Sequence, residues 1–303
     1  LRKINMELEK DKDAAGFGEL FTKTWKIPLF IAIGIMFVQQ FVGINTVIYY
    51  APTIFLIAGF EGAKAAIAAT VSVGIINVLA TVVSMFLIDK IGRRKLYFIG
   101  LVGMCIALAA LGAFFIMKDS LGDSLKWVTV STVLIYIVFF AISLGPLGWL
   151  IISEIFPTKY RGVGVSVGAF SNWFFNGIVA FTFLKLAWAF TVPGMEMIKE
   201  NAGAELTQTE MAILEKYDIP PGSTKEEVRE VYYQDGIPEE DLKAILKQYQ
   251  IDPNPAGSFF VYSFIAILGI LWGLKYIPET KGVTLEEIEE HWRSGKMPNE
   301  LNS

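Results

Sequence analysis

The sequence predicts an all-α membrane protein built around six transmembrane helices. Of its 303 residues, 53% are hydrophobic and only 18% are charged, and the mean hydropathy is +0.49. A soluble domain of this size would carry more charge on its surface. The charged residues are also clustered, and they leave six apolar stretches of the roughly 20 residues that cross a bilayer. These observations argue against six buried helices of a soluble protein.

The six predicted spans, each bounded by charge, Gly or Pro, cover about 27–57, 66–88, 96–117, 127–153, 162–190 and 257–277. The loops after the second and fourth spans carry four and two Lys or Arg residues, whereas the alternate loops carry one and two. Because Lys and Arg favour the cytoplasmic side, both ends of the chain are expected there. We therefore predict a multi-pass integral protein of the plasma membrane or the bacterial inner membrane.

Three segments lie outside the spans. Residues 1–26 begin with a charged helical run, Arg2 to Lys12, and we expect them to be the end of a cytoplasmic linker that follows an earlier, missing half. Residues 191–256 contain fourteen Asp or Glu against six Lys or Arg, and a short apolar pattern recurs within them after 32 residues. They predict a small acidic helical insertion on the extracytoplasmic side, either a tolerated surface insertion or a binding module. Residues 278–303 form a cytoplasmic tail after the last span.

The first span, part of the transmembrane region 27–190, carries three amide side chains, Gln39, Gln40 and Asn45, at a depth where unsatisfied polar groups are costly. On an ideal helix Gln40 and Asn45 lie about 140° apart, so one straight face cannot hold all three. Gly43 lowers helix propensity between them, and Pro52 removes a backbone donor beyond them. A broken helix would let the amides converge on one cavity, as in transporters. Alternatively, the amides bond neighbouring helices together.

Five motifs follow one another along the chain: Gln39-Gln40-Phe41-Val42-Gly43-Ile44-Asn45 with Tyr49-Tyr50-Ala51-Pro52, Asp89-Lys90-Ile91-Gly92-Arg93-Arg94, Gly145-Pro146 with Trp149, Ser153-Glu154-Ile155-Phe156-Pro157 with Arg161-Gly162, and Pro278-Glu279-Thr280-Lys281-Gly282. In this order they resemble the motifs of the sugar porters of the major facilitator superfamily, which include bacterial xylose–proton symporters and animal glucose facilitators. The resemblance covers nearly the whole chain except 191–256. It implies the C-terminal half of a twelve-helix fold, a transporter that moves a monosaccharide by alternating access, and no enzyme activity.

The resemblance also implies the residues that contact the sugar and close the site. The implied sugar contacts are Gln39, Gln40, Asn45, Asn77, Phe140, Trp149, Asn172 and Trp173, and the implied outer gate is Tyr49 with Tyr50. Amides suit sugar hydroxyls because they donate and accept hydrogen bonds without net charge. An indole such as that of Trp149 can cover an apolar sugar face while its N–H stays available. Gly145 and Pro146 predict a bend in the fourth span, which a gating helix could use. A transporter must release its cargo, so we expect a Kd near 1 mM, which corresponds to about −4 kcal/mol.

A second set of residues carries charge near the cytoplasmic ends of the spans. By resemblance, Asp89, Arg93, Arg94, Glu154 and Arg161 form a cytoplasmic gate, with Glu279 and Lys281 at its edge. Arg suits such a gate because its planar fork binds a carboxylate through two hydrogen bonds. Exposed pairs are usually worth only about 0–1 kcal/mol, which holds one state without trapping it.

No Asp, Glu, His or Arg lies in the middle of a predicted span, and the sequence shows no nucleotide loop, metal cluster or catalytic triad. We expect no cofactor and no nucleic-acid partner; the expected partners are a monosaccharide, the lipid bilayer and a missing N-terminal six-helix half. Ala141 stands where facilitators of the family often carry Glu, which favours proton symport over uniport of a sugar or an inositol-type polyol. A membrane sugar sensor is the alternative from a different class. The solitary His291 is expected to be solvated.

Overall fold

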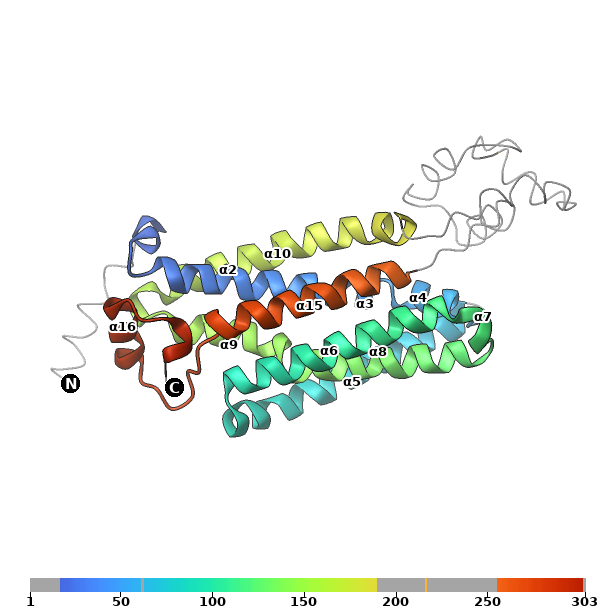
Figure 1. The fold of residues 1–303 in the computed structure, drawn as a ribbon, viewed down its shortest axis with the longest axis horizontal. Helices are drawn as coiled ribbons and strands as arrows, with labels where there is room; N and C mark the ends of the chain where they lie inside the picture. The colour runs from blue at the N-terminus through green and yellow to red at the C-terminus, as the bar shows by residue number, and fades with distance from the viewer. Residues whose placement is uncertain (1–16, 61–62, 190–215, 217–254, 302–303) are drawn as a thin grey trace, which may run out of the picture. The chain divides into compact units, whose positions relative to one another are not determined.

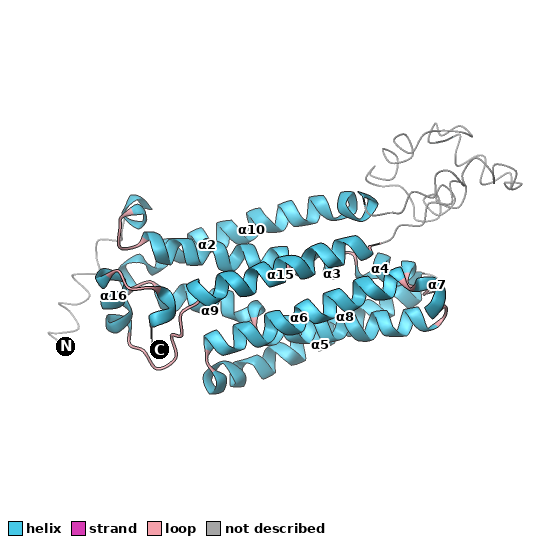
Figure 2. Ribbon diagram, in the orientation of Figure 1, coloured by secondary structure: helices cyan, strands magenta, loops and turns pink. Residues whose placement is uncertain are grey.

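The computed structural model describes residues 17–60, 63–189, 216 and 255–301, which are helical with short connections and contain no β-strand (Figures 1 and 2). The chain divides into two compact units, one of Leu1–Phe181 with Phe259–Ser303 and one of Thr182–Ser258. Most of the predicted linker 1–26 and nearly all of the predicted insertion 191–256 lie outside the described residues. Every contact discussed below lies within the first unit.

Six helical runs are long and apolar enough to cross a membrane, as the sequence predicted. They are formed by α2 (Lys26–Phe41) with α3 (Ile44–Tyr49), α5 (Ala63–Ile91), α6 (Arg93–Ile116), α8 (Ser124–Ile142) with α9 (Leu144–Ile155), α10 (Thr158–Ala189) and α15 (Ala256–Tyr276). The shorter elements are η1 (Phe17–Phe21), α4 (Ala51–Ile57), α7 (Lys118–Leu121), α16 (Leu285–Ser294) and η2 (Pro298–Glu300). Within the first unit α8 packs against both α5 and α6, and α2 packs against α9 (Figure 1).

The first span is broken at Gly43, as its sequence predicted. Gly43 adopts φ +87° and ψ +19°, a left-handed conformation that a residue with a Cβ atom takes only with strain. The backbone carbonyl of Val42 at the break accepts a hydrogen bond from the Tyr136 hydroxyl of α8 at 2.9 Å. One turn further on, the Thr46 hydroxyl lies 3.0 Å from the Tyr262 hydroxyl of α15. Both contacts are buried, so two neighbouring helices hold the break in place.

The fourth span is also broken, between α8 and α9. The sequence predicted a bend at Gly145 and Pro146, and the break falls at Ser143, which has φ −129° and ψ −101°. Pro146 instead occupies the first turn of α9, where its missing N–H costs no intrahelical hydrogen bond. The Ser143 side chain donates to the carbonyl of Phe139 at 2.6 Å. The proline thus marks the start of the second helix rather than the bend itself.

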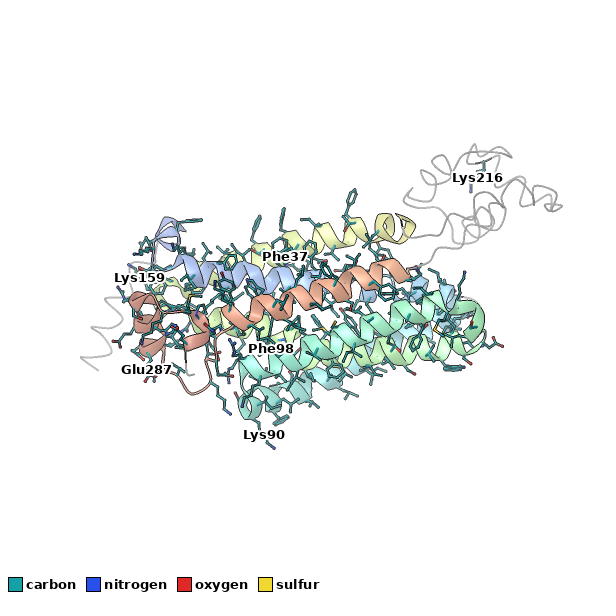
Figure 3. The ribbon with its side chains drawn as sticks, in the orientation of Figure 1. Phe37, Lys90, Phe98, Lys159, Lys216 and Glu287 are labelled. Atoms are coloured by element: carbon teal, nitrogen blue, oxygen red, sulfur yellow. The ribbon has the colours of Figure 1, made fainter. Side chains whose placement is uncertain are left out.

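The tail after α15 folds back onto the bundle. The Trp292 indole of α16 donates to the backbone carbonyl of Ile155, the last residue of α9, at 3.0 Å. His291 is buried, with 8% of its surface exposed, and its Nε2 lies 2.9 Å from the carbonyl of Met297, so the expectation that it is solvated is wrong. Figure 3 places the labelled Lys159 and Glu287 toward the same end of the bundle as α16. We call this the α16 end.

Candidate functional site

A hollow of about 250 Å³ opens between the two broken spans and α10. It is open on one side, and it brings together most of the side chains that the sequence singled out. Its lining consists of Gln39, Gln40, Ile44, Asn45, Ile48, Tyr49, Phe140, Gly145, Trp149, Asn172, Trp173 and Asn176. No Asp, Glu, Lys, Arg or His is among these described lining residues, so the hollow is polar without being charged.

Four of the lining amides form a continuous row, which we call the amide row: Asn172, Gln39, Gln40 and Asn45. Gln39 Oε1 accepts hydrogen bonds from Asn172 Nδ2 at 2.6 Å and from Gln40 Nε2 at 3.3 Å. Gln40 Oε1 accepts from Asn45 Nδ2 at 2.6 Å. On an unbroken helix Gln40 and Asn45 would face apart, so the left-handed Gly43 between them is what permits this contact.

Gln39 anchors the row to α9. Its Nε2 donates to the backbone carbonyls of Leu144 at 2.7 Å and Gly145 at 3.2 Å, the first two residues of that helix. With only 3% of Gln39 exposed, these contacts are made away from solvent. The amides therefore do both things that the sequence left open: they bond α2, α9 and α10 together, and they gather on one hollow. Each primary amide has two N–H groups and two acceptor lone pairs, so the row keeps capacity for further partners.

Aromatic side chains complete the hollow. Phe140, Trp149 and Trp173 all line it, and Trp149 and Trp173 are 39% and 70% exposed. Tyr49, the last residue of α3, is half exposed and also lines the hollow. The hydroxyl of the next residue, Tyr50, donates to the carbonyl of Ala180 at 3.3 Å. A site with flat apolar faces and neutral hydrogen-bonding groups is matched to a ligand that has hydroxyls and apolar C–H faces, and not to an ion.

One predicted contact residue lies elsewhere, and several lining residues were missed. Asn77 of α5 is partly exposed and is not among the residues that line the hollow, so its predicted contact with sugar stays a prediction. Asn176 was missed, although it lies four residues after Asn172 on α10 and so shares its face, a signal present in the sequence. Ile44 and Ile48 were missed because an isoleucine in an apolar span carries no distinguishing pattern.

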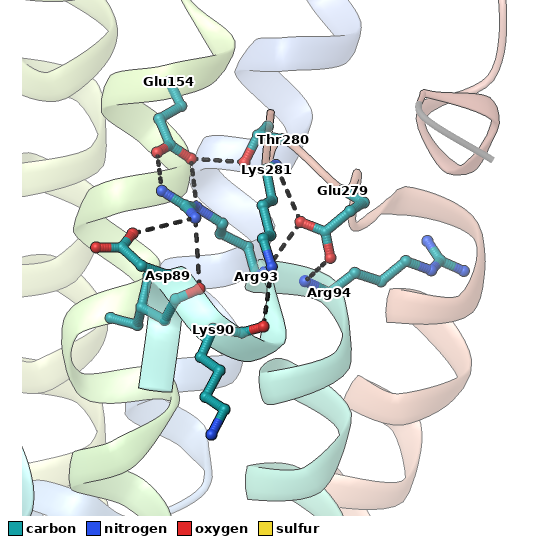
Figure 4. Close-up of polar contacts among 9 residues, drawn as sticks. Asp89, Lys90, Arg93, Arg94, Glu154, Glu279, Thr280 and Lys281 are labelled. Carbon is teal, nitrogen blue, oxygen red and sulfur yellow. Dashed lines mark hydrogen bonds and ion pairs between the residues drawn. The ribbon is translucent and has the colours of Figure 1, made fainter. Parts of the chain in front are cut away.

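At the α16 end, a second polar group joins the turn between α5 and α6, the end of α9 and the tail after α15 (Figure 4). We call it the charge cluster; it comprises Asp89, Arg93, Arg94, Glu154, Glu279, Thr280 and Lys281. Arg93 binds Glu154 as a fork, through Nη2 to Oε1 at 2.8 Å and Nε to Oε2 at 3.2 Å. The Thr280 hydroxyl donates to the same Glu154 carboxylate at 2.5 Å. Asp89 lies 3.5 Å from Arg93 and is 81% exposed, so it belongs to the edge of the cluster.

Glu279 caps the start of α6. Its two oxygens accept hydrogen bonds from the backbone N–H groups of Arg93 at 3.0 Å and Arg94 at 3.2 Å. A carboxylate is favoured there because the first N–H groups of a helix have no intrahelical partner and carry partial positive charge. The guanidinium of Arg94 turns away toward the end of α15, where it donates to the carbonyls of Ile277 and Leu274.

The remaining predicted gate residue, Arg161, stands apart from the cluster. Its Nε is buried and has no hydrogen-bond partner among the described residues. The structure therefore joins Asp89, Arg93, Arg94 and Glu154 in one network and leaves Arg161 outside it. The sequence identified the charged members but gave no reason to select Thr280, whose hydroxyl reaches Glu154 from 126 positions away.

The sequence is similar to those of known transporters. The family model described as "Sugar (and other) transporter" matches residues 2–199 and 242–292. The chain is 40% identical over 189 residues to the D-xylose transporter of Levilactobacillus brevis, covering 60% of this chain and 41% of that protein. It is 28% identical over 295 residues to the putative metabolite transport protein YncC of Bacillus subtilis, covering 97% of this chain and 49% of that protein. The chain thus spans about half the length of these curated relatives.

Solved structures agree in fold. The proton:xylose symporter XylE bound to 6-bromo-6-deoxy-D-glucose aligns with a TM-score of 0.58 and 29% identity, covering 87% of this chain and 42% of that chain. These relatives are transporters and not enzymes. With six membrane-crossing helices and a family match over more than half its length, the chain belongs to the Sugar (and other) transporter family of the major facilitator superfamily and folds as its C-terminal six-helix half.

Proposed function

We propose that this chain is half of a secondary transporter that moves a monosaccharide across a membrane by alternating access. The observation that carries the proposal is the amide row of Asn172, Gln39, Gln40 and Asn45 on an uncharged hollow. The relatives add support, because those named for a sugar include a D-xylose transporter and a symporter bound to a glucose derivative. A second six-helix unit would close the open side of the hollow.

Binding in such a site rests on neutral hydrogen bonds and aromatic contact. Sugar hydroxyls would exchange hydrogen bonds with the row, in particular with Gln40 and Asn45, while Trp149 covers an apolar face of the ring. A neutral hydrogen bond contributes about 0.5–1.5 kcal/mol net, so a few of them give the millimolar affinity that permits release. Tyr49 and Tyr50 would close the outer side.

The charge cluster is the proposed gate on the cytoplasmic side. Lys and Arg residues gather at the α16 end, which favours the cytoplasm for that end. The Arg93–Glu154 fork has side chains that are only 12% and 22% exposed, so it is screened less than a surface pair. The fork would be formed in the state that is closed to the cytoplasm and broken in the state that is open to it. Arg161 would pair with a residue of the second half.

We further propose proton symport rather than uniport. Support comes from Ala141, buried on α8, at the position where family facilitators often carry Glu. The measurement is sugar-driven proton uptake by proteoliposomes that contain the full-length gene product. Alkalinisation of the outer solution on sugar addition is expected, whereas sugar entry with no proton movement would establish uniport of a sugar or polyol.

The transport proposal is tested by uptake of radiolabelled xylose, glucose and inositol into cells that express the full-length gene product. The expected result is saturable uptake of at least one of these, lost in Gln40→Ala. The matched control is Asn299→Ala, which removes an exposed amide in η2 and should leave uptake unchanged. If no hexose, pentose or polyol is taken up or competes, the proposal is wrong.

A further inference from the structure

Three aromatic rings meet at the α16 end, where α2 begins and α15 ends (Figure 1). The ring centroid of Phe30 on α2 lies 4.9 Å from that of Tyr276 and 6.1 Å from that of Trp272, and the two α15 rings stack at 5.6 Å. Phe30 is 49% exposed, and the other two rings are partly exposed. We call these three residues the aromatic patch; none of them lines the hollow.

Two polar atoms of the aromatic patch have no partner in the described part of the chain. The Trp272 indole N–H and the Tyr276 hydroxyl form no hydrogen bond with a described residue, and neither is among the buried atoms that lack a partner. Both are therefore reachable from outside the bundle. Side chains with an apolar body and a polar tip are typical of the boundary between a membrane and water. Two such donors side by side suit an acceptor at the depth of the lipid headgroups.

A lysine flanks the aromatic patch on each helix. Lys26, the first residue of α2, lies one turn before Phe30, and Lys275 of α15 places its Nζ 5.5 Å from the ring centroid of Tyr276. Both lysines are exposed, and neither side chain forms an ion pair or hydrogen bond with a described residue. By contrast, Lys159 at the same end pairs with a carboxylate at 3.6 Å. The two ammonium groups beside the patch are not neutralised within the described residues.

An apolar stripe continues from the aromatic patch along the membrane-crossing part of α15. Leu271, Leu268 and Phe264 are all exposed, and they precede Lys275 by 4, 7 and 11 residues, so the four side chains share one helix face. This face has the same order as a phospholipid, with charge and hydrogen-bonding groups at one end and apolar surface beyond. A lipid can therefore lie along it with its headgroup at the aromatic patch and an acyl chain on the stripe.

We propose that the aromatic patch, together with Lys26 and Lys275, binds the headgroup of an anionic phospholipid in the membrane leaflet at the α16 end. The phosphate accepts hydrogen bonds from Trp272 and Tyr276, and the two ammonium groups balance the negative charge. A zwitterionic phospholipid offers the same phosphate but carries its own cation, so charge complementarity favours the anionic headgroup. Because the site draws on α2 and α15, the bound lipid joins the first span to the last. The site requires only that the chain is embedded in a membrane, whatever solute is transported.

The test is lipid binding by the detergent-solubilised full-length gene product, measured by native mass spectrometry as the Kd of the first bound lipid. Phosphatidylglycerol and phosphatidylcholine with the same acyl chains are compared. A lysine near an anionic lipid contributes about fivefold, so the unmodified protein should prefer phosphatidylglycerol by about 25-fold. Lys26→Gln and Lys275→Gln should each reduce that preference about fivefold, and the double variant should bind both lipids equally. Equal affinity for the two lipids in the unmodified protein would overturn the inference.

Lys95→Gln is the matched control for charge alone. Lys95 is also an exposed lysine at the α16 end, and Ile99, Val102 and Ile106 continue from it as an exposed apolar stripe on α6. That helix contributes nothing to the aromatic patch, so Lys95→Gln should leave both affinities unchanged. A loss of phosphatidylglycerol binding as large as that of Lys275→Gln would show only diffuse attraction to positive charge, and the site would not exist.

Two further measurements test the phosphate contact. Tyr276→Phe removes only the hydroxyl and should weaken binding of both lipids about fivefold, because both carry the phosphate. Unchanged affinities would show that the hydroxyl does not bind the headgroup. Inorganic phosphate at millimolar concentration should leave the bound lipid in place, since it has no acyl chain to contact the stripe. Displacement of the lipid by inorganic phosphate would assign the site to the free anion and overturn the choice of a lipid.

Discussion

Replacing Gly43 by Ala tests the broken first span most directly. Gly43 holds φ +87° and ψ +19°, and an L-residue in the left-handed region costs about 1–2 kcal/mol. An added Cβ would also lie 2.5–2.9 Å from three ring atoms of Tyr262, which is only 3% exposed and whose hydroxyl lies 3.0 Å from that of Thr46. Forcing a buried ring aside typically costs about 1–3 kcal/mol. Gly43→Ala should therefore destabilise the protein by about 2–5 kcal/mol.

The chain supplies controls that isolate the steric part. Gly295, at the end of α16, has nearly the same backbone angles, φ +73° and ψ +18°, with open space where its Cβ would stand. Gly59, after α4, has φ +99° and is equally open. Ala at either position should cost only the conformational part, about 1–2 kcal/mol. Because Gly59 lies between two helices of the bundle whereas Gly295 follows α16 in the tail, Gly59→Ala is the control for global unfolding.

The assay is thermal unfolding of the detergent-solubilised full-length gene product, followed by tryptophan fluorescence. The double variant Gly43→Ala with Tyr262→Leu removes the obstructing ring, and a double-mutant cycle should return a coupling of about 1–3 kcal/mol. Equal losses for Gly43→Ala and Gly59→Ala, together with an additive cycle, would refute the reasoning that Tyr262 fixes the break.

Three further predictions concern the α16 end. Arg93→Lys keeps the charge but loses the fork to Glu154, which should cost about 1 kcal/mol and raise amide hydrogen exchange at the α5–α6 turn about fivefold; unchanged exchange would contradict the cluster's role. Trp292→Phe keeps an aromatic ring but removes the N–H donor to the carbonyl at the end of α9. The amide hydrogens of α16 should therefore exchange about fivefold faster, while those of α2 should exchange at an unchanged rate. Hydrogen bonds from the backbone and then the side chain of Thr284 lower the pKa of Glu287 below its usual 4.5, so their stabilisation is present above that pH and is lost as the pH falls through the lowered pKa. Amide hydrogen exchange of α16 should become faster in that acidic range, and the change should be smaller in the Thr284→Val variant than in the unmodified protein.

The sequence predicted what depends on short-range pattern. The length and apolar character of the six spans follow from composition alone, and the break at Gly43 follows from a glycine placed between amides that one helix face cannot hold. The sequence predicted a bend at Gly145 and Pro146, but the structure places the break at Ser143, because proline is tolerated in the first turn of the next helix. The same rule applies to Pro52, which lies in the first turn of α4.

The partners of these features could not be predicted, because they come from distant segments. Tyr136 reaches Val42 across 94 positions and Tyr262 reaches Thr46 across 216, and each tyrosine looks like any other aromatic in an apolar span. The mistaken solvation of His291 is different in kind. Ile288 and Trp292 lie four residues apart on α16 and are buried on the same face as His291. This apolar spacing could have predicted the buried face, but the surrounding charged residues obscured it.

The position of α9 explains how the two polar groups of this half can depend on each other. Its first residues accept hydrogen bonds from Gln39 of the amide row, and near its other end Glu154 binds Arg93 of the charge cluster. Twelve residues of α-helix make a rod of about 18 Å, which transmits displacement from end to end. Because the helix is interrupted at Ser143, α9 is a separate helix and not a continuation of α8. Under the proposed function, a ligand that reorders the amide row would act on the charge cluster through one short helix, and only to the extent that it binds the two arrangements of that helix with different affinity.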